Sequence, residues 1–376
     1  MPLPINLEKL ILNKTIESSR IEYKRSWNPE KVLHTICAFA NDYENLGGGY
    51  IIIGIEEENS RPREVVGVTD NDVNHMMKDL IRICNMMDPR YMPVCSEEYC
   101  NDTRLFVIWA PAGESRPYKC PISLGNERRT NEKGYFIRRV SSTIRATHEE
   151  EKDLISVSRL HTFDDSMNID ADISDIGLGL VQDYLDRVKS KMDTDSENKI
   201  QILKDMRLVR GPPEALKPLN VGLMMFNRRP DDFFPYAWID LVVMPDPTGD
   251  GMSERSFKGS LDTQLLNILE YIKGNLIEER IFKIQDRAEA IRIFNYPYEA
   301  LEEIIVNAVY HKDYRIGQQI TVVFRSDCVE ITSFPGPDAC ISDEDLKNLT
   351  LRSPNYRNKR LGDYLKELHL AEGRNT

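Results

Sequence analysis

The sequence predicts a mixed α and β fold, with an N-terminal domain in residues 1–150, a connector with two helices in 151–210 and a C-terminal domain in 211–376. The apolar run YIIIGI (50–55) follows three glycines and is typical of a short strand buried on both faces. In the run from Tyr298 to Tyr314, apolar residues recur at helical spacing. With 376 residues, 41% of them hydrophobic, the chain can bury a large core.

The N-terminal domain is predicted to contain both strands and helices. Ile21 and Tyr23 alternate with charged residues at the strand period, and the run from Pro29 to Asn41 has the helical period. The remaining predicted elements are a helix at Met76–Met87, strands at 104–110 and 134–140, and a helix opened by the capping box of Thr147 and Glu150.

The second half of the chain begins with a polar, acidic stretch without a clear period, from Ser156 to Asp172, which is predicted to be a connecting segment. Two helices are expected next, roughly at Ile176–Lys191 and Glu197–Met206. The C-terminal domain is expected to contain strands at NVGLMMF (220–226), WIDLVVM (238–244), QQITVVF (318–324) and VEIT (329–332), with helices at 261–279 and 298–314.

The composition limits the location and the partners. A net charge of −12 disfavours nonspecific binding of the whole molecule to nucleic acid or anionic membranes, but it permits a local basic groove. The seven cysteines include no Cys-x-x-Cys pair, so we expect reduced thiols and no structural zinc site. No apolar run approaches the roughly 20 residues that span a bilayer, and the N-terminus has no apolar signal segment. We therefore expect a soluble, cytoplasmic protein without a membrane partner.

A polar stripe on the helix at 298–314 suits nucleotide chemistry. Glu303, Asn307 and His311 recur every four residues and share one helix face. A carboxylate can orient water and an amide oxygen can ligate Mg²⁺, although a solvated helix face would show the same spacing. Together with the following HKDY and the downstream ITSFPG, this run resembles the first ATP-site motif of the GHKL ATPases. It is most similar to a divergent branch found in bacterial proteins labelled as helicase-related or as transcriptional regulators.

The resemblance implies a GHKL-like α/β sandwich in which Glu303 is catalytic and Asn307 ligates Mg²⁺. It also implies that Asn307, His311 and Gly336 contact ATP. Phe334 stands where GHKL enzymes place the Asp that reads adenine, and a phenyl ring cannot accept that hydrogen bond. The chain ends at AEGRNT, where related sequences continue into a phosphate-covering segment. We therefore expect this domain to be truncated and its ATP binding to be weak or absent.

A second set of motifs covers roughly residues 15 to 147. IESSRIEYK, AFAN, the glycine turn, YIIIGIEEE and SSTIRAT together resemble the Schlafen AlbA-like domain. The resemblance implies nucleic-acid binding. In nuclease members it also implies three carboxylates that hold Mg²⁺ or Mn²⁺ and activate water. The matching residues here are Glu17, Glu22 and either Glu56 or Glu57, with Glu17 and Glu22 as metal ligands.

Two features of this sequence depart from the Schlafen pattern. The third carboxylate is Glu where the family usually has Asp, and DYENL is inserted between AFAN and the glycines. A structural alternative is that Glu22 pairs with Lys24 or Arg25, while Glu56 to Glu58 form a solvated turn.

Basic residues gather between Ala110 and Ala146. Eight Lys and Arg lie there against three acidic residues, with Tyr118, Tyr135 and Phe136 interleaved. This combination suits phosphate contact with base stacking, although exposed cations that only aid solubility would give the same count. The predicted nucleic-acid contacts are Lys24, Arg25, Arg128, Arg129, Arg138, Arg139 and Arg145.

Taken together, these features predict a nucleic-acid-binding protein, acting on DNA or RNA as a transcriptional regulator, with a nucleotide-binding-like C-terminal module. One alternative is a divalent-metal-dependent endoribonuclease of Schlafen type. The other is a non-catalytic scaffold that forms homo-oligomers.

Overall fold

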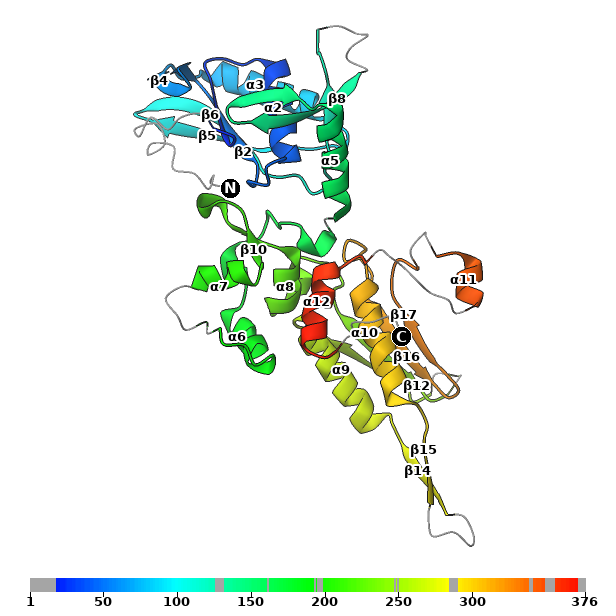
Figure 1. Cartoon of the computed structure of the whole chain (residues 1–376). Coiled ribbons are helices and arrows are strands. Elements are labelled where there is room, and N and C mark those ends of the chain that lie inside the picture. Colours follow the sequence, from blue (N-terminus) through cyan, green and yellow to red (C-terminus); the bar gives the residue numbers. More distant parts are fainter. Residues whose placement is uncertain are drawn as a thin grey trace. The chain divides into compact units, whose positions relative to one another are not determined.

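The computed structural model describes residues 18–125, 132–160, 162–192, 194, 199–246, 248, 250–283, 290–337, 341–348 and 356–370. The chain folds into two compact units (Figure 1). Unit 1 consists of residues 1–161 and 210–216, and unit 2 consists of residues 162–209 and 217–376. Within the described ranges, every helix is too short or too polar to cross a bilayer. The mixed α and β fold predicted from the sequence is confirmed.

Unit 1 is built on a four-stranded sheet with the order β1-β2-β6-β5. Its strands are β1 (Ile21–Lys24), β2 (Gly49–Ile53), β5 (Val94–Cys100) and β6 (Thr103–Ala110). β1 runs parallel to β2, whereas β6 is antiparallel to both of its neighbours. The predicted buried strand is β2, in which all five residues are buried.

Helices α2 (Pro29–Asn41) and α3 (Asp70–Cys84) contribute, with one face of this sheet, to a single apolar core. α2 has the predicted bounds because Asn28 caps its first turn and Pro29 fixes the next residue in helical conformation. α3 begins earlier than the predicted Met76, because Thr69 and Asp72 form a capping box.

Two smaller β structures and one helix complete the N-terminal part of unit 1 (Figure 1). β3 (Ile55–Glu58) pairs with β4 (Arg61–Val65), and β7 (Lys119–Pro121), β8 (Lys133–Arg139) and β9 (Ser142–Arg145) form a three-stranded sheet. α5 (His148–Leu160) follows, and the backbone N–H groups of Thr147 and Glu150 each bond to the other residue's side chain. This confirms the predicted capping box.

Residues 210–216, which we call the covering segment, pack against the other face of the unit 1 sheet. Ala215 lies in a cluster with Tyr50 and Trp109, which are 1% and 2% exposed. Glu214 forms an ion pair with Arg20. Pro212 packs against Gly47, where an added Cβ atom would lie 3.0 Å from Cδ of the proline. A stretch far along the chain is therefore part of the N-terminal unit.

Unit 2 is built on a sheet with the order β13-β12-β16-β17 (Figure 1). Its strands are β12 (Ile239–Met244), β13 (Ser253–Phe257), β16 (Ile320–Arg325) and β17 (Val329–Thr332). In β16, Ile320, Val322 and Phe324 are buried and alternate with half-buried residues, as expected for a strand with one face in the core. The helices are α6 (Leu178–Arg187), α7 (Lys199–Asp205), α8 (Asn220–Phe226), α9 (Leu261–Asn275), α10 (Tyr298–His311), α11 (Asp343–Lys347) and α12 (Lys359–Glu367).

Two sequence predictions in unit 2 are wrong. NVGLMMF was predicted as a strand, but it forms α8, in which all seven residues are buried. A short run that is apolar on every side does not distinguish a buried strand from a buried helix. The helix predicted at 261–279 ends at Asn275, and Glu279 begins a new strand, β14 (Glu279–Lys283), which pairs with β15 (Ala290–Phe294).

Candidate nucleic-acid interface

Glu22 and Arg138 form a buried ion pair in unit 1. The alternation of β1 places Glu22 on the opposite face from Tyr23, and the two side chains are only 10% and 5% exposed. Nη1 of Arg138 lies 2.5 Å from Oε2 of Glu22, without the angles of a hydrogen bond. Nζ of Lys24 donates to the other oxygen. The charge of the carboxylate is therefore balanced by two cations. Glu22 is paired with Lys24, as the structural alternative predicted, and also with Arg138.

Arg138 is held by backbone carbonyls as well as by Glu22. Its guanidinium donates to the carbonyl oxygens of Ser18 and Ile21 at 3.2 Å and to Oγ1 of Thr143 at 3.1 Å. It also lies 5.5 Å above the ring of Phe39. Arg138 is only 4% exposed and its guanidinium is engaged by these contacts, so it is less available to phosphate than the predicted nucleic-acid contact requires. Its role is to tie β8 and β9 to β1.

The other predicted metal ligands do not gather around Glu22. Glu56 pairs with Arg25 at 3.0 Å, and Glu57 is exposed on β3. Glu17 lies outside the described residues. Within the part of the chain that the structure describes, no three His, Cys, Asp or Glu side chains are placed to share a metal ion. The described carboxylates therefore do not fit a divalent cation in this arrangement.

The AFAN motif has a structural role that the sequence did not reveal. The side-chain oxygen of Asn41 accepts from the N–H of Tyr118 at 2.6 Å, and its amide donates to the carbonyls of Tyr118 and Phe136 at 3.0 and 2.9 Å. Asn41 thereby joins the end of α2 to β8 and to the residue preceding β7. Tyr118 presents both a backbone N–H donor and a carbonyl acceptor to this side chain. A side-chain amide can accept from the first and donate to the second, which explains the Asn at this position.

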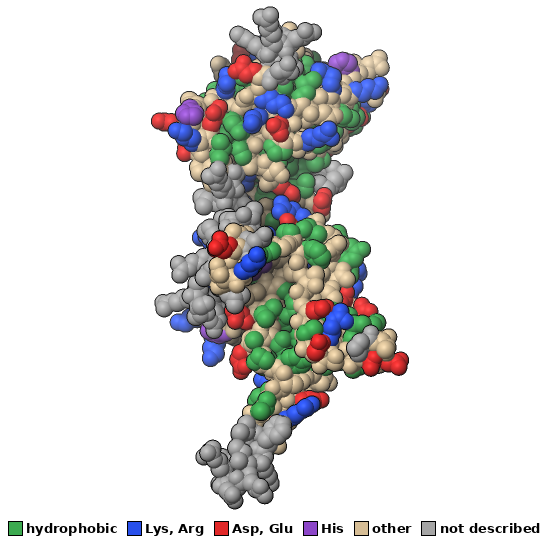
Figure 2. Space-filling view, turned by 90° about the vertical axis from the view of Figure 1, so that its right-hand side faces the viewer, with side chains coloured by type: hydrophobic (Ala, Val, Ile, Leu, Met, Phe, Trp, Pro, Cys, Tyr) green, Lys and Arg blue, Asp and Glu red, His purple; other side chains and the backbone are tan. Residues whose placement is uncertain are grey.

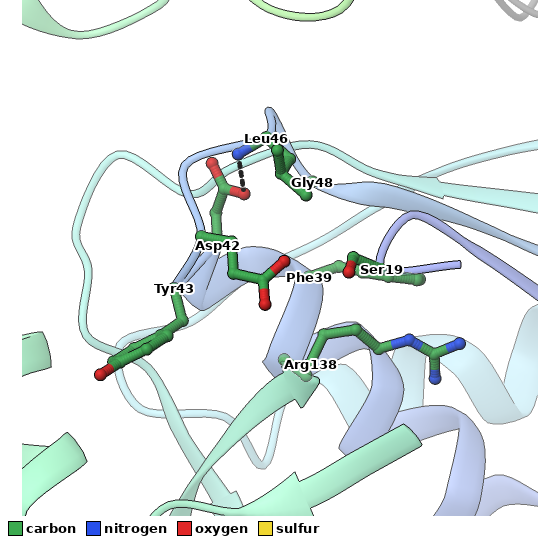
Figure 3. A pocket seen from close by; sticks show the side chains of 9 residues that line it. Ser19, Phe39, Asp42, Tyr43, Leu46, Gly48 and Arg138 are labelled. Carbon is green, nitrogen blue, oxygen red and sulfur yellow. Dashed lines mark hydrogen bonds between the residues drawn. The ribbon is translucent and has the colours of Figure 1, made fainter. Parts of the chain in front are cut away.

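The inserted DYENL segment (42–46) forms a turn whose backbone is bonded to the side chain of its first residue, Asp42, beside a small pocket. Asp42 accepts from the N–H group of Leu46 at 2.8 Å (Figure 3). It also accepts from the N–H of Gly47 at 3.0 Å, and Arg116 lies 3.7 Å away. Burial raises the pKa of Asp42, and these donors oppose the rise. The insertion is thus accommodated at the end of α2. The pocket is lined by Ser19, Ala38, Phe39, Asp42, Tyr43, Glu44, Leu46, Gly48 and Arg138.

Several described cations of unit 1 are paired with acids, and basic and acidic side chains are interspersed on the face shown in Figure 2. Arg139 is one example, since it contacts Glu150 at 3.0 Å and lies 4.7 Å above the ring of Tyr43. Lys24 and Arg25 are paired with Glu22 and Glu56. Because their charges are already paired, these three predicted nucleic-acid contacts are less available to phosphate than unpaired cations would be.

The β7–β8–β9 sheet carries cations with fewer acidic partners. Lys119 lies 5.6 Å from the centre of the Tyr135 ring, and Lys133 is exposed. Arg145 is half exposed and lies 3.7 Å from Glu132. We call Lys119, Lys133, Tyr135 and Arg145 the hairpin surface. Arg128 and Arg129 belong to the segment between β7 and β8 and lie outside the described residues.

In unit 2, three of the predicted ATP-site residues, Glu303, Asn307 and His311, share one face of α10, and Gly336 lies in the Pro-Gly turn. Glu303 and Asn307 are exposed, whereas His311 is half-buried and stacks on Tyr356 with 6.1 Å between the ring centres. Burial lowers the pKa of His311, and the nearby Arg357 lowers it further. Arg357 donates to the carbonyls of His311 and Gly336 at 3.0 and 2.9 Å, and so joins the end of α10 to the Pro-Gly turn.

Two other residues of this region are buried and structural. Nζ of Lys312 donates to the carbonyls of Ile316 and Gln318, and burial lowers its pKa to about 8. Asn358 donates to the carbonyls of Tyr310 and Lys312 at 2.8 and 2.7 Å. No pattern in the sequence indicates the roles of Arg357 and Asn358, although both lie in the basic run PNYRNKR (354–360).

The position expected to read adenine holds Phe334, which is 37% exposed and whose carbonyl accepts from the N–H of Asp313 at 2.8 Å. Glu303 and Asn307 share an exposed face of α10 and their role at a nucleotide site stays a prediction, while the side chain of Phe334 provides no acceptor for an adenine amino group.

Comparison with known proteins identifies the N-terminal region. Residues 17–147 match the family described as Schlafen, AlbA_2, so this region contains a domain of that family. No curated protein sequence matches the chain.

Two solved structures resemble parts of the chain. One is the DIP2311 protein of Corynebacterium diphtheriae, with 16% identity over 94% of this chain and 68% of that one, and a TM-score of 0.42. The other is the N-terminal domain of a Nitrosomonas europaea protein described as related to the ATP-dependent DNA helicase RecG. It has 25% identity over 39% of this chain and 94% of that one, and a TM-score of 0.27.

Proposed function

We propose, from the Schlafen AlbA_2 domain at residues 17–147, that this protein binds nucleic acid through unit 1 and acts as a regulator. The observation that carries the proposal is the hairpin surface, where Lys119 lies over the ring of Tyr135 and Lys133 follows on the same face of β8, while Arg145 lies opposite Phe136 on the other face of the sheet. Cations that lack close acidic partners release counterions when they meet phosphates, and an aromatic ring accepts a stacked base of any sequence. Among the described residues, Lys119 and Lys133 have no carboxylate within 4.0 Å.

The net charge of −12 supports a local contact in preference to a general one. Acidic side chains elsewhere repel the phosphate backbone at low salt, so binding has to depend on a small number of cations. We therefore expect a strong salt dependence with a slope that reflects about two or three phosphate contacts.

The test is a binding titration by fluorescence anisotropy with tRNA, duplex DNA and single strands of equal length. In the variant K119A/K133A/R145A, we expect affinity to fall about tenfold or more and the salt slope to decrease by roughly two to three. The matched control is R61A/R63A/K78A, which removes three exposed cations from β4 and α3 of the same unit. Equal loss in both triple variants, or no loss in the first, would remove the hairpin surface from the binding site.

A further inference from the structure

β14 and β15 form a ribbon that extends away from the sheet of unit 2 (Figure 1). Among the described residues, no third strand pairs with either of them. Hydrophobic and charged side chains lie together on this projection (Figure 2), and Ile281, Ile293 and Phe294 are 56%, 51% and 55% exposed. A two-stranded hairpin alone is marginally stable in water, and an uncovered strand edge is a template for pairing with another strand.

The backbone groups at the open edge of β14 can be assigned from the ladder. In an antiparallel pair, positions that exchange backbone hydrogen bonds alternate with positions that do not. The N–H of Asn295 donates to the carbonyl of Glu278 at 3.2 Å, and Glu279 is the register partner of Phe294. By alternation, the N–H and C=O groups of Glu279, Ile281 and Lys283 point away from β15 and toward the open edge.

These same three positions are complementary to a second copy of themselves. If two β14 strands pair antiparallel about a two-fold axis at Ile281, each Glu279 lies opposite Lys283 of the other copy, and the two Ile281 residues face each other. Opposite charges at directly facing positions stabilise a strand pair. The equivalent pairing of β15 about its central residue would place Arg292 against Arg292, and like charges there destabilise the pair.

We propose that β14 is a dimerisation edge, and that two copies of this chain pair through it into a four-stranded sheet with the order β15-β14-β14-β15. The pairing would form about six backbone hydrogen bonds between the copies. It would also bring the two Ile281 side chains, now exposed, into contact. An isologous two-fold interface uses the same surface on both copies, which is the arrangement that this charge pattern favours. Because the strands are short, we expect a dimer whose population depends on protein concentration.

The test is sedimentation velocity on the full chain over a concentration series. The wild type should show a reversible increase in dimer as concentration rises. E279K places lysines opposite Lys283, and K283E places glutamates opposite Glu279, so each variant alone should dimerise at least about tenfold more weakly. An equimolar mixture of E279K and K283E should dimerise again, because each mutated edge is then complementary to the other.

The control is R292Q, which removes the 3.1 Å ion pair between Arg292 and Glu279 inside the hairpin but leaves the charges at the edge unchanged. It should dimerise as the wild type does. A wild type that stays monomeric at every concentration would overturn the proposal. Single variants that dimerise normally would do so as well, and so would a mixture that remains monomeric.

Discussion

The buried ion pair of Glu22 and Arg138 links β1 to β8 in unit 1. A buried charge that loses its partner costs about 3–5 kcal/mol, so the two side chains hold each other in place. Because Arg138 also binds the carbonyls of Ser18 and Ile21, the pair fixes the start of β1 against β8. A divalent cation at Glu22 would have to displace both Lys24 and Arg138.

This competition gives a prediction for metal binding. We expect Mn²⁺ to leave the melting temperature of the wild type unchanged, because Glu22 is already neutralised. A cation that bound at a hundred times its dissociation constant would instead stabilise the fold by about 2.7 kcal/mol. The measurement is thermal unfolding with Mn²⁺, Mg²⁺ or no metal, for the wild type and for Glu22→Gln and Glu149→Gln. Glu149 is exposed on α5, outside the predicted carboxylate set, and provides the control.

A melting temperature that Mn²⁺ raises in the wild type, but not in Glu22→Gln, would contradict this expectation. Such a result would favour the metal-dependent endoribonuclease. RNA cleavage that is lost in the same variant would then assign the activity to this site.

At the scale of single elements, α12 packs on α10 through a glycine. A Cβ atom at Gly362 would lie 2.4 Å from the ring of Tyr310. Tyr310 is 6% exposed and stacks on Tyr356 with 5.5 Å between ring centres, so its ring has little room to move. The close approach of the two helices therefore depends on the missing side chain.

We predict that Gly362→Ala destabilises the protein by about 1–2 kcal/mol. The overpacking costs about 1–3 kcal/mol, and the higher helix propensity of Ala returns up to about 1 kcal/mol. The matched control is Gly274→Ala in α9, where no atom lies within 4 Å of the added methyl group, and that variant should be neutral or stabilising. Urea unfolding of both variants measures the difference. Equal stabilities would show that α12 can shift away from Tyr310.

The elements that could be predicted are those whose signals are local. α2 was predicted with its observed bounds because its cap and its period both lie within the helix. α8 was not, because its seven buried residues have no period that separates helix from strand. The role of Arg138 depends on carbonyls more than a hundred positions away in the chain, and no pattern within β8 indicates them. Asn41 was visible as part of a motif, but its partners in Tyr118 and Phe136 were not.

At the scale of the whole molecule, the two units carry resemblances of different strength. The Schlafen AlbA_2 match at residues 17–147 points to a nucleic-acid-related function. In unit 2 the ATP site remains a prediction from the sequence, and it depends on the exposed face of α10 that holds Glu303 and Asn307. These residues provide a carboxylate and an amide, but Phe334 provides no acceptor for an adenine amino group.

We therefore predict that Mg-ATP binds weakly to this chain, with a dissociation constant of about 1 mM or higher, which corresponds to about −4 kcal/mol. Isothermal titration calorimetry with Mg-ATP and Mg-GTP would measure it. Similar weak heats for both nucleotides would fit a site that does not read the base. If binding is instead tight and is lost in Asn307→Ala, a nucleotide site that reads the base by other residues exists on α10.

Because of the covering segment, the boundary between the two units is not a single point in the sequence. Because residues 210–216 belong to unit 1, the chain passes between the units at three places, near residues 161, 209 and 216. A protease that cuts one of these crossings would leave the units joined by the other two. A gene fragment that ends at residue 161 would encode the AlbA_2 match but lack Glu214 and Ala215, leaving Arg20 unpaired and Tyr50 and Trp109 uncovered on that side. Fragments for dissecting this protein are better designed by spatial unit than by a single division of the sequence.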